Sequence, residues 1–228
     1  MRPDQSPLAL EGIHLWVLDL SQKTRDLGVL SQEEEARASR FVNALDRKRF
    51  RAAHQLLRQI LARYLGEPPQ ALVFGATAAG KPYLQAPGRL PPLAFNLAHS
   101  AGLGLLALCL EREVGADIEA LTRLEDLPGV AREIMSPAEW QSFQAVPREL
   151  AHDVFFGLWT RKEALLKAAG TGLSFDPREI HLGLAPGRAA KVAFQGKIWS
   201  VAPVEAAPGA KAAAAIEGPL PEIRIFRA

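Results

Sequence analysis

Cysteine is almost absent from this chain of 228 residues, since Cys109 is the only one. An intramolecular disulfide is therefore excluded, which fits a reducing compartment. Cys109 is also not expected to be a nucleophile, because it lies in the apolar run 103–110 without a basic neighbour that would lower the pKa of its thiol. The five histidines show no zinc-ligand spacing with one another or with Cys109.

Long apolar runs and a strong charge of one sign are missing as well. No run approaches the roughly 20 apolar residues that cross a bilayer, and the N-terminus lacks the basic and apolar regions of a secretory signal. The net charge of +2 predicts no broad polyanion-binding surface. It is compatible with a local basic pocket for a phosphorylated small molecule. We expect a cytoplasmic protein that binds neither membrane nor nucleic acid.

Local patterns predict a mixture of helices and strands. Strands are expected at 13–20, 71–74, 80–84 after a turn, 93–97, 103–110, 114–119, 180–184, 192–194, 197–204, 211–216 and 222–226, the last five as an antiparallel set. Helices are expected from Ser31 with a capping box to Glu34, over 46–65, from Ser136, and through Trp159 to a stop at Gly170. Residues 98–102, with His99, are expected to form a polar turn.

Two acidic residues share one face of the strand 114–119. Asp117 and Glu119 are two apart, and successive side chains of a strand alternate, so both point the same way while Ile118 points opposite. Neighbouring carboxylates repel and need a cation or solvent. With oxygen ligands only, the cation would be Mg²⁺ or Mn²⁺; a solvated strand edge is the alternative.

The helix through Trp159 carries charge on a mostly apolar surface. Glu163 and Lys167 are four apart, so they share a face with Trp159 one turn earlier. A solvated ion pair worth roughly 0.2–0.5 kcal/mol would also explain them. The helices near the N-terminus carry a basic set that a solvated face would explain equally: Arg37, Arg40, Arg47, Lys48, Arg49, Arg51 and Arg58.

Two spaced motifs resemble the paired signature of the 4′-phosphopantetheinyl transferases. Residues 115–119 (GADIE) are similar to Gly-x-Asp-x-Glu, and residues 159–173 (WTRKEALLKAAGTGL) to Trp-x-x-Lys-Glu-x-x-x-Lys-x-x-Gly-x-Gly-Leu. Upstream segments resemble further family blocks in the same order: 37–58, 80–83 (GKPY) and 95–100 (FNLAHS). The length is similar to that of the long, Sfp-type monomeric subgroup.

The resemblance implies a fold and a reaction. The fold would be α+β, with two similar α/β halves related by a pseudo-two-fold axis, each a small antiparallel sheet packed with helices. Residues 1–112 would form the coenzyme A-binding half, and 113–228 the half with the metal and catalytic motifs. The enzyme, of the holo-[acyl-carrier-protein] synthase type, would move the 4′-phosphopantetheine arm of coenzyme A to a serine of an apo acyl or peptidyl carrier protein. It would depend on Mg²⁺, with Mn²⁺ as the alternative, and release 3′,5′-ADP.

Site residues follow from the same motifs. Asp117, Glu119 and Glu163 would hold the metal against the pyrophosphate. Glu163 would also take the proton of the attacking serine, directly or through a water, and Lys167 would meet phosphate oxygens. The positions that match the coenzyme A-binding blocks are Lys81, Pro82, His99, Ser100, Arg40, His54 and Lys162.

Two departures from the family pattern leave another reading open. The family often has a serine near the 3′-phosphate where this chain has Ala98, and an arginine that contacts coenzyme A where it has His54. A carrier-binding paralogue with impaired catalysis is therefore one alternative. A metal-dependent nuclease is another, but that chemistry usually sets Glu and Lys two apart on a strand, whereas Glu163 and Lys167 are four apart on a helix.

Overall fold

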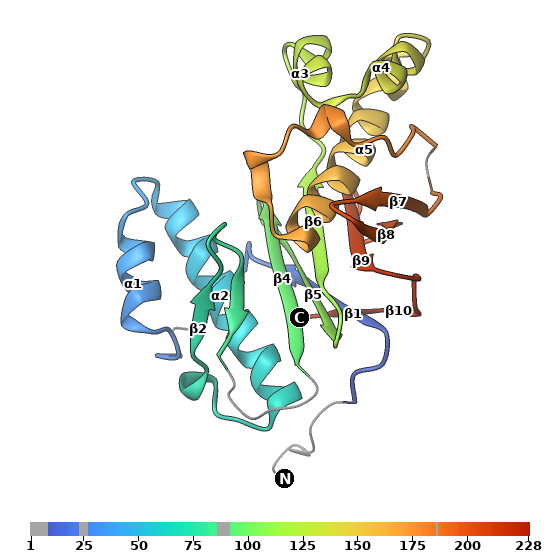
Figure 1. The fold of residues 1–228 in the computed structure, drawn as a ribbon. Coiled ribbons are helices and arrows are strands. Elements are labelled where there is room, and N and C mark those ends of the chain that lie inside the picture. The colour runs from blue at the N-terminus through green and yellow to red at the C-terminus, as the bar shows by residue number, and fades with distance from the viewer. Residues whose placement is uncertain (1–8, 23–26, 86–91, 186) are drawn as a thin grey trace.

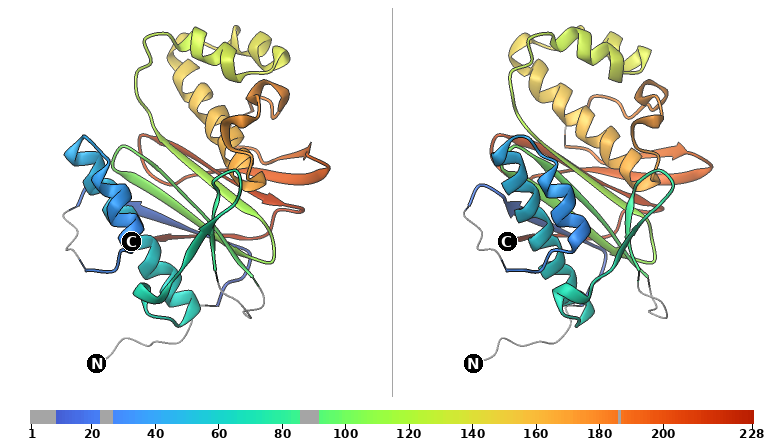
Figure 2. Two further views of the ribbon diagram at one scale, coloured as in Figure 1. Left: turned by 60° about the vertical axis from the view of Figure 1, so that its left-hand side comes forward. Right: turned by 90° about the vertical axis from the view of Figure 1, so that its left-hand side faces the viewer.

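The computed structural model describes residues 9–22, 27–85, 92–185 and 187–228, and it shows two four-stranded sheets with helices on their outer sides (Figures 1 and 2). The first sheet has the order β10-β1-β5-β4, made of Ile223–Arg227, Ile13–Asp19, Leu103–Leu110 and Leu93–Ser100. The second has the order β6-β9-β8-β7, made of Val114–Ala120, Ala210–Glu217, Lys197–Val204 and Ala190–Phe194. The predicted α+β class is confirmed.

Five α-helices and a small hairpin complete the described part of the chain. The helices are α1 Gln32–Ser39, α2 Ala44–Leu65, α3 Leu127–Ile134, α4 Pro137–Phe143 and α5 Arg148–Ala169. The hairpin pairs β2 Phe74–Ala76 with β3 Pro82–Leu84, and single 3-10 turns lie at Pro69–Ala71, Gly172–Ser174 and Pro177–Glu179. None of the described helices is long and apolar enough to cross a bilayer.

The two large sheets pack face to face. Ile13, Leu105 and Ala107 of the first sheet share one buried core with Ile118 and Ala214 of the second. The helix α2 covers the outer face of the first sheet, and α5 covers the outer face of the second. Each sheet thus carries one helix of 22 residues, which agrees with the implied pair of similar halves.

Alternation along β6 directs its side chains as the sequence predicts. Ala116 and Ile118 enter the core between the sheets, so Asp117 and Glu119 face the side of α5. The predicted capping box at Ser31 is present, and the predicted helix start at Ser136 has one as well, with Glu139. The C-cap Gly170 has φ 73°, the left-handed conformation that ends α5 as predicted.

Some predicted elements differ in the structure. Residues 180–184 form no strand, because the amides of Leu182 and Gly183 donate to the Glu139 carboxylate instead of to a neighbouring strand. Residues 98–100 continue β4, since they pair with 103–105 and leave only a short turn in which Ala101 has φ 52°. The predicted strand at 71–74 starts only at Phe74, after a 3-10 turn, and α3 was not predicted.

The last strand joins the first sheet. Residues 222–226 were expected in an antiparallel set with the other late strands, but β10 pairs with β1, and it does so in parallel, with Ile13 beside Ile223. The ring of Phe226 stacks on Trp16 with centroids 4.8 Å apart. The sheet of residues 13–110 is therefore completed by a strand from the far end of the chain.

Candidate functional site

The backbone of α5 lies directly on β6 because Gly115 has no side chain. A Cβ at this position would be 2.2 Å from the Ala164 carbonyl oxygen and 2.3 Å from the Ala168 amide nitrogen. No other residue type fits such an approach. The contact brings the outward face of β6, with Asp117, beside Glu163 and Lys167, which precede Ala164 and Ala168 in α5.

A cluster of buried charges results from this contact. Asp117 is 3% exposed and Glu163 is 9% exposed. The Lys167 ammonium lies 2.5 Å from Asp117 Oδ1 and 3.8 Å from Glu163 Oε2. One cation thus serves two carboxylates, and Asp117 Oδ2 and Glu163 Oε1 are both buried without a hydrogen-bond partner. Orphaned buried oxygens of this kind indicate a place for further positive charge.

The burial of these acids affects their proton affinity. Desolvation raises the pKa of Glu163, Lys167 lowers it, and Asp117 and Glu119 raise it further. Desolvation likewise raises the pKa of Asp117, against the effect of Lys167. Both carboxyls therefore hold a proton more readily than in water, and a bound cation would favour their ionised forms.

Side chains of β4 hold β6 in place where the two strands lie side by side. The Ser100 hydroxyl donates to Glu119 Oε2 over 2.6 Å and accepts from the Ala120 amide over 3.3 Å. Asn96 Oδ1 accepts from the Ala116 amide over 2.8 Å. These bonds fix the orientation of Glu119 from the other half of the molecule.

The three acids do not form a ready-made metal cage. Within the part of the chain that the structure describes, no three His, Cys, Asp or Glu side chains are grouped closely enough to hold a metal ion. The Lys167 ammonium lies against two of the carboxylates, and Ser100 binds Glu119. The donor set is nevertheless all oxygen, and two of its atoms are without partners, which fits a hard divalent cation.

A second group of polar side chains lies between this cluster and α2. The pKa of His99, on β4, is lowered by desolvation and then by the nearby charges of His54, Lys167 and Arg37. His54 Nδ1 lies 2.9 Å from Glu34 Oε1, and its ring packs on Phe50 at 4.1 Å. The predicted nucleotide-side residues His54 and His99 therefore lie on the side of the first sheet that α2 covers, and the charge of Lys167 acts on His99.

Glu34 organises the helix side of this group. Its Oε2 accepts from Arg58 Nε over 2.7 Å and from the Ser31 amide over 2.8 Å. Desolvation raises the pKa of Glu34, but the bonds from His54, Ser31 and Arg58 outweigh it and lower the value to about 2. Arg58 is 2% exposed and also donates to the carbonyls of the 69–72 turn, so it is structural rather than part of a solvated basic face.

Lys81 is occupied by protein contacts. Its ammonium donates to Glu113 Oε2 over 2.5 Å, to the Ala168 carbonyl over 2.8 Å and to the Val114 carbonyl over 3.3 Å. It therefore ties the hairpin β2–β3 to the C-terminal end of α5. Among the other predicted coenzyme A residues, Pro82 starts β3 and Arg40 is the exposed C-cap of α1.

Comparison with known proteins identifies the family. The family model of the 4′-phosphopantetheinyl transferase superfamily matches residues 113–215, and that of the 4′-phosphopantetheinyl transferase N-terminal domain matches residues 15–110. The 4′-phosphopantetheinyl transferase HetI of Nostoc sp. is 35% identical over 95% of this chain and 92% of its own. The chain belongs to the 4′-phosphopantetheinyl transferase superfamily.

Further relatives share shorter stretches with this transferase. A 4′-phosphopantetheinyl transferase of Bacillus subtilis is 32% identical over 69% of this chain and 67% of its own. The human L-aminoadipate-semialdehyde dehydrogenase-phosphopantetheinyl transferase is 28% identical over 69% of this chain and 53% of its own. The chain is thus an enzyme of the transferase class, as its motifs predict.

Lys162 of this transferase does not reach the cluster, although it was predicted to bind coenzyme A. It is 0% exposed, and its ammonium donates to Glu139 Oε2 over 2.6 Å and to the carbonyls of Ile134 and Pro177 over 2.8 and 2.9 Å. Three bonds use all three ammonium hydrogens. Its contacts join α5 to α4, to the end of α3 and to the turn at Pro177, which is a structural role.

Lys162→Met is expected to lower the free energy of unfolding of the transferase without changing its affinity for coenzyme A. The change leaves Glu139 buried without its cation, which costs about 3–5 kcal/mol, and calorimetry should show the lower Tm. The double variant Lys162→Met with Glu139→Gln should recover part of the loss. A normal Tm with a tenfold higher KM for coenzyme A would contradict the structural role.

Sequence reasoning missed the links that β4 makes to β6. Asn96 belongs to the segment 95–100 that resembles a family block, and it shares the inward face of β4 with Ala98. A polar residue at an inward position of an apolar strand was the available signal, because a buried amide must find a partner. The contacts of Lys81 and Lys162 left no comparable signal, since nothing local distinguishes a buried lysine from an exposed one.

Proposed function

We propose that this transferase uses coenzyme A as donor, an apo acyl or peptidyl carrier protein as acceptor, and Mg²⁺ as cofactor. The observation that carries the proposal is the pair of buried, partnerless oxygens of Asp117 and Glu163 beside Lys167. A divalent cation and a pyrophosphate supply the charges that this arrangement lacks. Mn²⁺ would suit the same oxygen ligands.

Asp117, Glu119 and Glu163 are the proposed ligands of the cation. When bound, the cation neutralises negative charge on the pyrophosphate oxygens of coenzyme A as the phosphorus–oxygen bond breaks. The hydrogen bond from Ser100 orients the Glu119 carboxylate before any ligand arrives. The close approach at Gly115 keeps the strand that carries Asp117 beside the helix that carries Glu163.

Lys167 and Glu163 are the proposed catalytic residues. The Lys167 side chain is 29% exposed, so its ammonium can turn from Asp117 to an incoming phosphate oxygen and stabilise the charge that develops there. Glu163 takes the proton of the attacking serine, directly or through a water.

The nucleotide of coenzyme A is proposed to lie along His99 and His54, with Arg37 and Arg40 of the α1 end close by. Ala98 matters little to this site, because its side chain is 4% exposed and belongs to the core between the sheets. Alanine in place of the family serine at position 98 therefore removes no side chain from the face of β4 that carries His99. Lys81, Pro82 and Ser100 remain proposals for this site, with Lys81 and Ser100 first having to leave their protein contacts.

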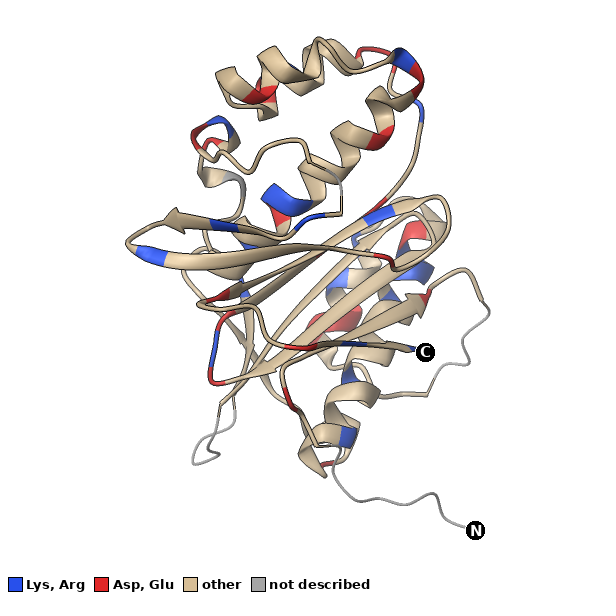
Figure 3. Ribbon diagram, turned by 90° about the vertical axis from the view of Figure 1, so that its right-hand side faces the viewer, with Lys and Arg blue, Asp and Glu red and all other residues tan. Residues whose placement is uncertain are grey.

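The alternatives receive less support from these residues. A paralogue without turnover has no need of two buried carboxylates that share a single cation, because such an arrangement is costly to keep. A nuclease is disfavoured by the helical spacing of Glu163 and Lys167, and basic and acidic residues are interspersed rather than separated in the view of Figure 3.

Because one chain supplies both sides of the site, we propose a monomer, and we place it in the cytoplasm.

A direct assay tests the proposed function. An apo carrier protein is incubated with coenzyme A, Mg²⁺ and the enzyme, and its mass is then measured. A gain of one phosphopantetheine arm is expected, absent with EDTA and absent when the acceptor serine of the carrier is replaced by alanine. Unchanged masses across acyl and peptidyl carriers would refute the transfer, whereas full activity in EDTA would refute only the metal.

A further inference from the structure

Arg161 is a buried cation that differs from the other buried cations described. Arg58 is paired with Glu34, and Lys162 with Glu139. Arg161 is 4% exposed, yet within the described residues it makes no ion pair. Its Nε donates to the Gly157 carbonyl over 3.0 Å and its Nη2 to the Gly183 carbonyl over 2.7 Å.

Two carbonyl bonds compensate only part of the charge of a buried guanidinium. Desolvation lowers the pKa of Arg161, and the distant Glu139 opposes this effect. The Glu139 carboxylate is already bonded to Lys162 and to three amides, so it is not available as a partner. Within the described residues, Arg161 is therefore a buried cation with no carboxylate in ion-pair contact, although Asp153 and Glu205 line the same cavity.

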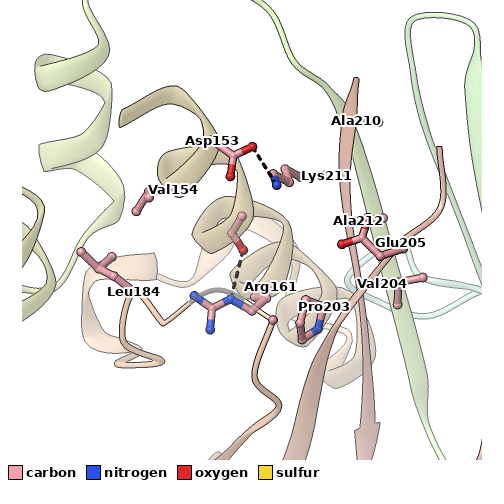
Figure 4. A pocket seen from close by; sticks show the side chains of 12 residues that line it. Asp153, Val154, Arg161, Leu184, Pro203, Val204, Glu205, Ala210, Lys211 and Ala212 are labelled. Atoms are coloured by element: carbon pink, nitrogen blue, oxygen red, sulfur yellow. Dashed lines mark hydrogen bonds and ion pairs between the residues drawn. The ribbon is translucent and has the colours of Figure 1, made fainter. Parts of the chain in front are cut away.

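A cavity of about 100 Å³ opens beside this guanidinium. It lies between the first half of α5 and the strands β8 and β9, with Arg161, Leu184, Pro203 and Ala212 among its walls (Figure 4). At its rim, Lys211 Nζ lies 2.7 Å from Asp153 Oδ1. Nη1 of Arg161 makes no hydrogen bond to the described part of the chain, so its two hydrogens are available.

We propose that this cavity binds a compact oxyanion, either phosphate or a carboxylate group, through Nη1 of Arg161. A guanidinium presents planar donors that match these anions. The volume accepts several waters or one small anion, but no nucleotide. Lys211 can add a second cationic contact by turning from Asp153, and the carboxylate of Glu205, which also lines the cavity, makes no ion pair with Arg161.

The site is separate from the catalytic cluster. Arg161 and Glu163 are two residues apart on α5, so they point to nearly opposite sides of the helix. An anion at Arg161 would not compete with ligands of Glu163 or Lys167. It would instead bind to the helix that carries both catalytic residues and stabilise the folded chain by mass action.

Phosphate binding to the full-length chain tests the proposal. Calorimetric titration with sodium phosphate, at constant ionic strength, is compared among the wild type, Arg161→Met and the control Lys167→Met. Loss of Arg161 should weaken one phosphate site at least about tenfold, because charged hydrogen bonds are removed. Lys167→Met should keep that site, since any phosphate at the catalytic cluster is a different one.

Two further measurements identify the ligand and cover the case in which Arg161→Met does not fold. Acetate in place of phosphate identifies a carboxylate site if it alone shows the dependence on Arg161. If Arg161→Met does not fold, Arg161→Lys replaces it, and a weaker site is again expected because the planar pair of donors is lost. Equal affinities in the wild type and in the folded Arg161 variant, for both anions, would overturn the proposal.

Discussion

Glu163→Gln is expected to reduce kcat for carrier modification by about 10²–10⁴-fold without destabilising the chain. The rate falls because the amide can neither accept the serine proton nor ligate a cation as a carboxylate does. Stability should hold or rise because the variant replaces a buried carboxyl whose Oε1 has no partner. The rate is measured by carrier mass at saturating substrates, and stability by urea unfolding in EDTA.

The raised pKa of Glu163 also predicts the direction in which stability changes with pH. The pKa of Glu163 is raised in the folded state, so the folded chain binds this proton more tightly than the unfolded chain. Its contribution therefore destabilises the fold as pH rises above the unfolded pKa. Glu163→Gln should remove this loss at neutral pH.

Glu149→Gln is the matched control, since Glu149 is exposed in the first turn of the same helix. It should leave both rate and stability close to those of the wild type. Near-normal turnover of Glu163→Gln would show that Glu163 is neither base nor metal ligand. A large loss of stability in that variant would show instead that the carboxylate serves the fold.

Gly115→Ala should both destabilise the chain and reduce turnover. The added Cβ would overlap backbone atoms of Ala164 and Ala168, which cannot move aside as a side chain can. We expect a loss of about 3 kcal/mol, or a Tm lower by about 10 °C in a chain of this size. Displacement of α5 would also separate Glu163 from Asp117, so kcat should fall even well below the Tm.

Gly157→Ala, in α5, is the control for Gly115→Ala, because it adds the same methyl group where there is room for it. A Cβ at Gly157 meets nothing within 4 Å, and alanine favours a helix interior by up to about 1 kcal/mol over glycine. This variant should be as stable as the wild type or more so. If Gly115→Ala behaved like Gly157→Ala, the close contact of β6 and α5 would not be what assembles the cluster.

Local rules explain why much of this cluster could be predicted. The alternation of β6 placed Asp117 and Glu119 on one face, and the αL glycine at position 170 set the end of α5. Both features depend on neighbouring residues in the sequence only. The pairing of Glu163 with Asp117 needed the family resemblance as well, because the two lie 46 positions apart.

Long-range contacts explain what could not be predicted. Lys81 and Lys162 were assigned to coenzyme A by motif, but their acceptors come from segments that no local pattern joins to them. The amides of Leu182 and Gly183 donate to the Glu139 carboxylate, so the strand predicted at 180–184 does not form. The partner of β10 is equally a matter of the whole fold, since an apolar strand fits many sheet edges.

The pairing of β10 with β1 also sets an order of assembly during synthesis. Until residues 223–227 have been synthesised, one edge of β1 is unpaired and Trp16 lacks its stacking contact with Phe226. Such an edge can pair with other chains. The first sheet therefore remains incomplete while residues 113–217 are made, and β10 then completes that sheet.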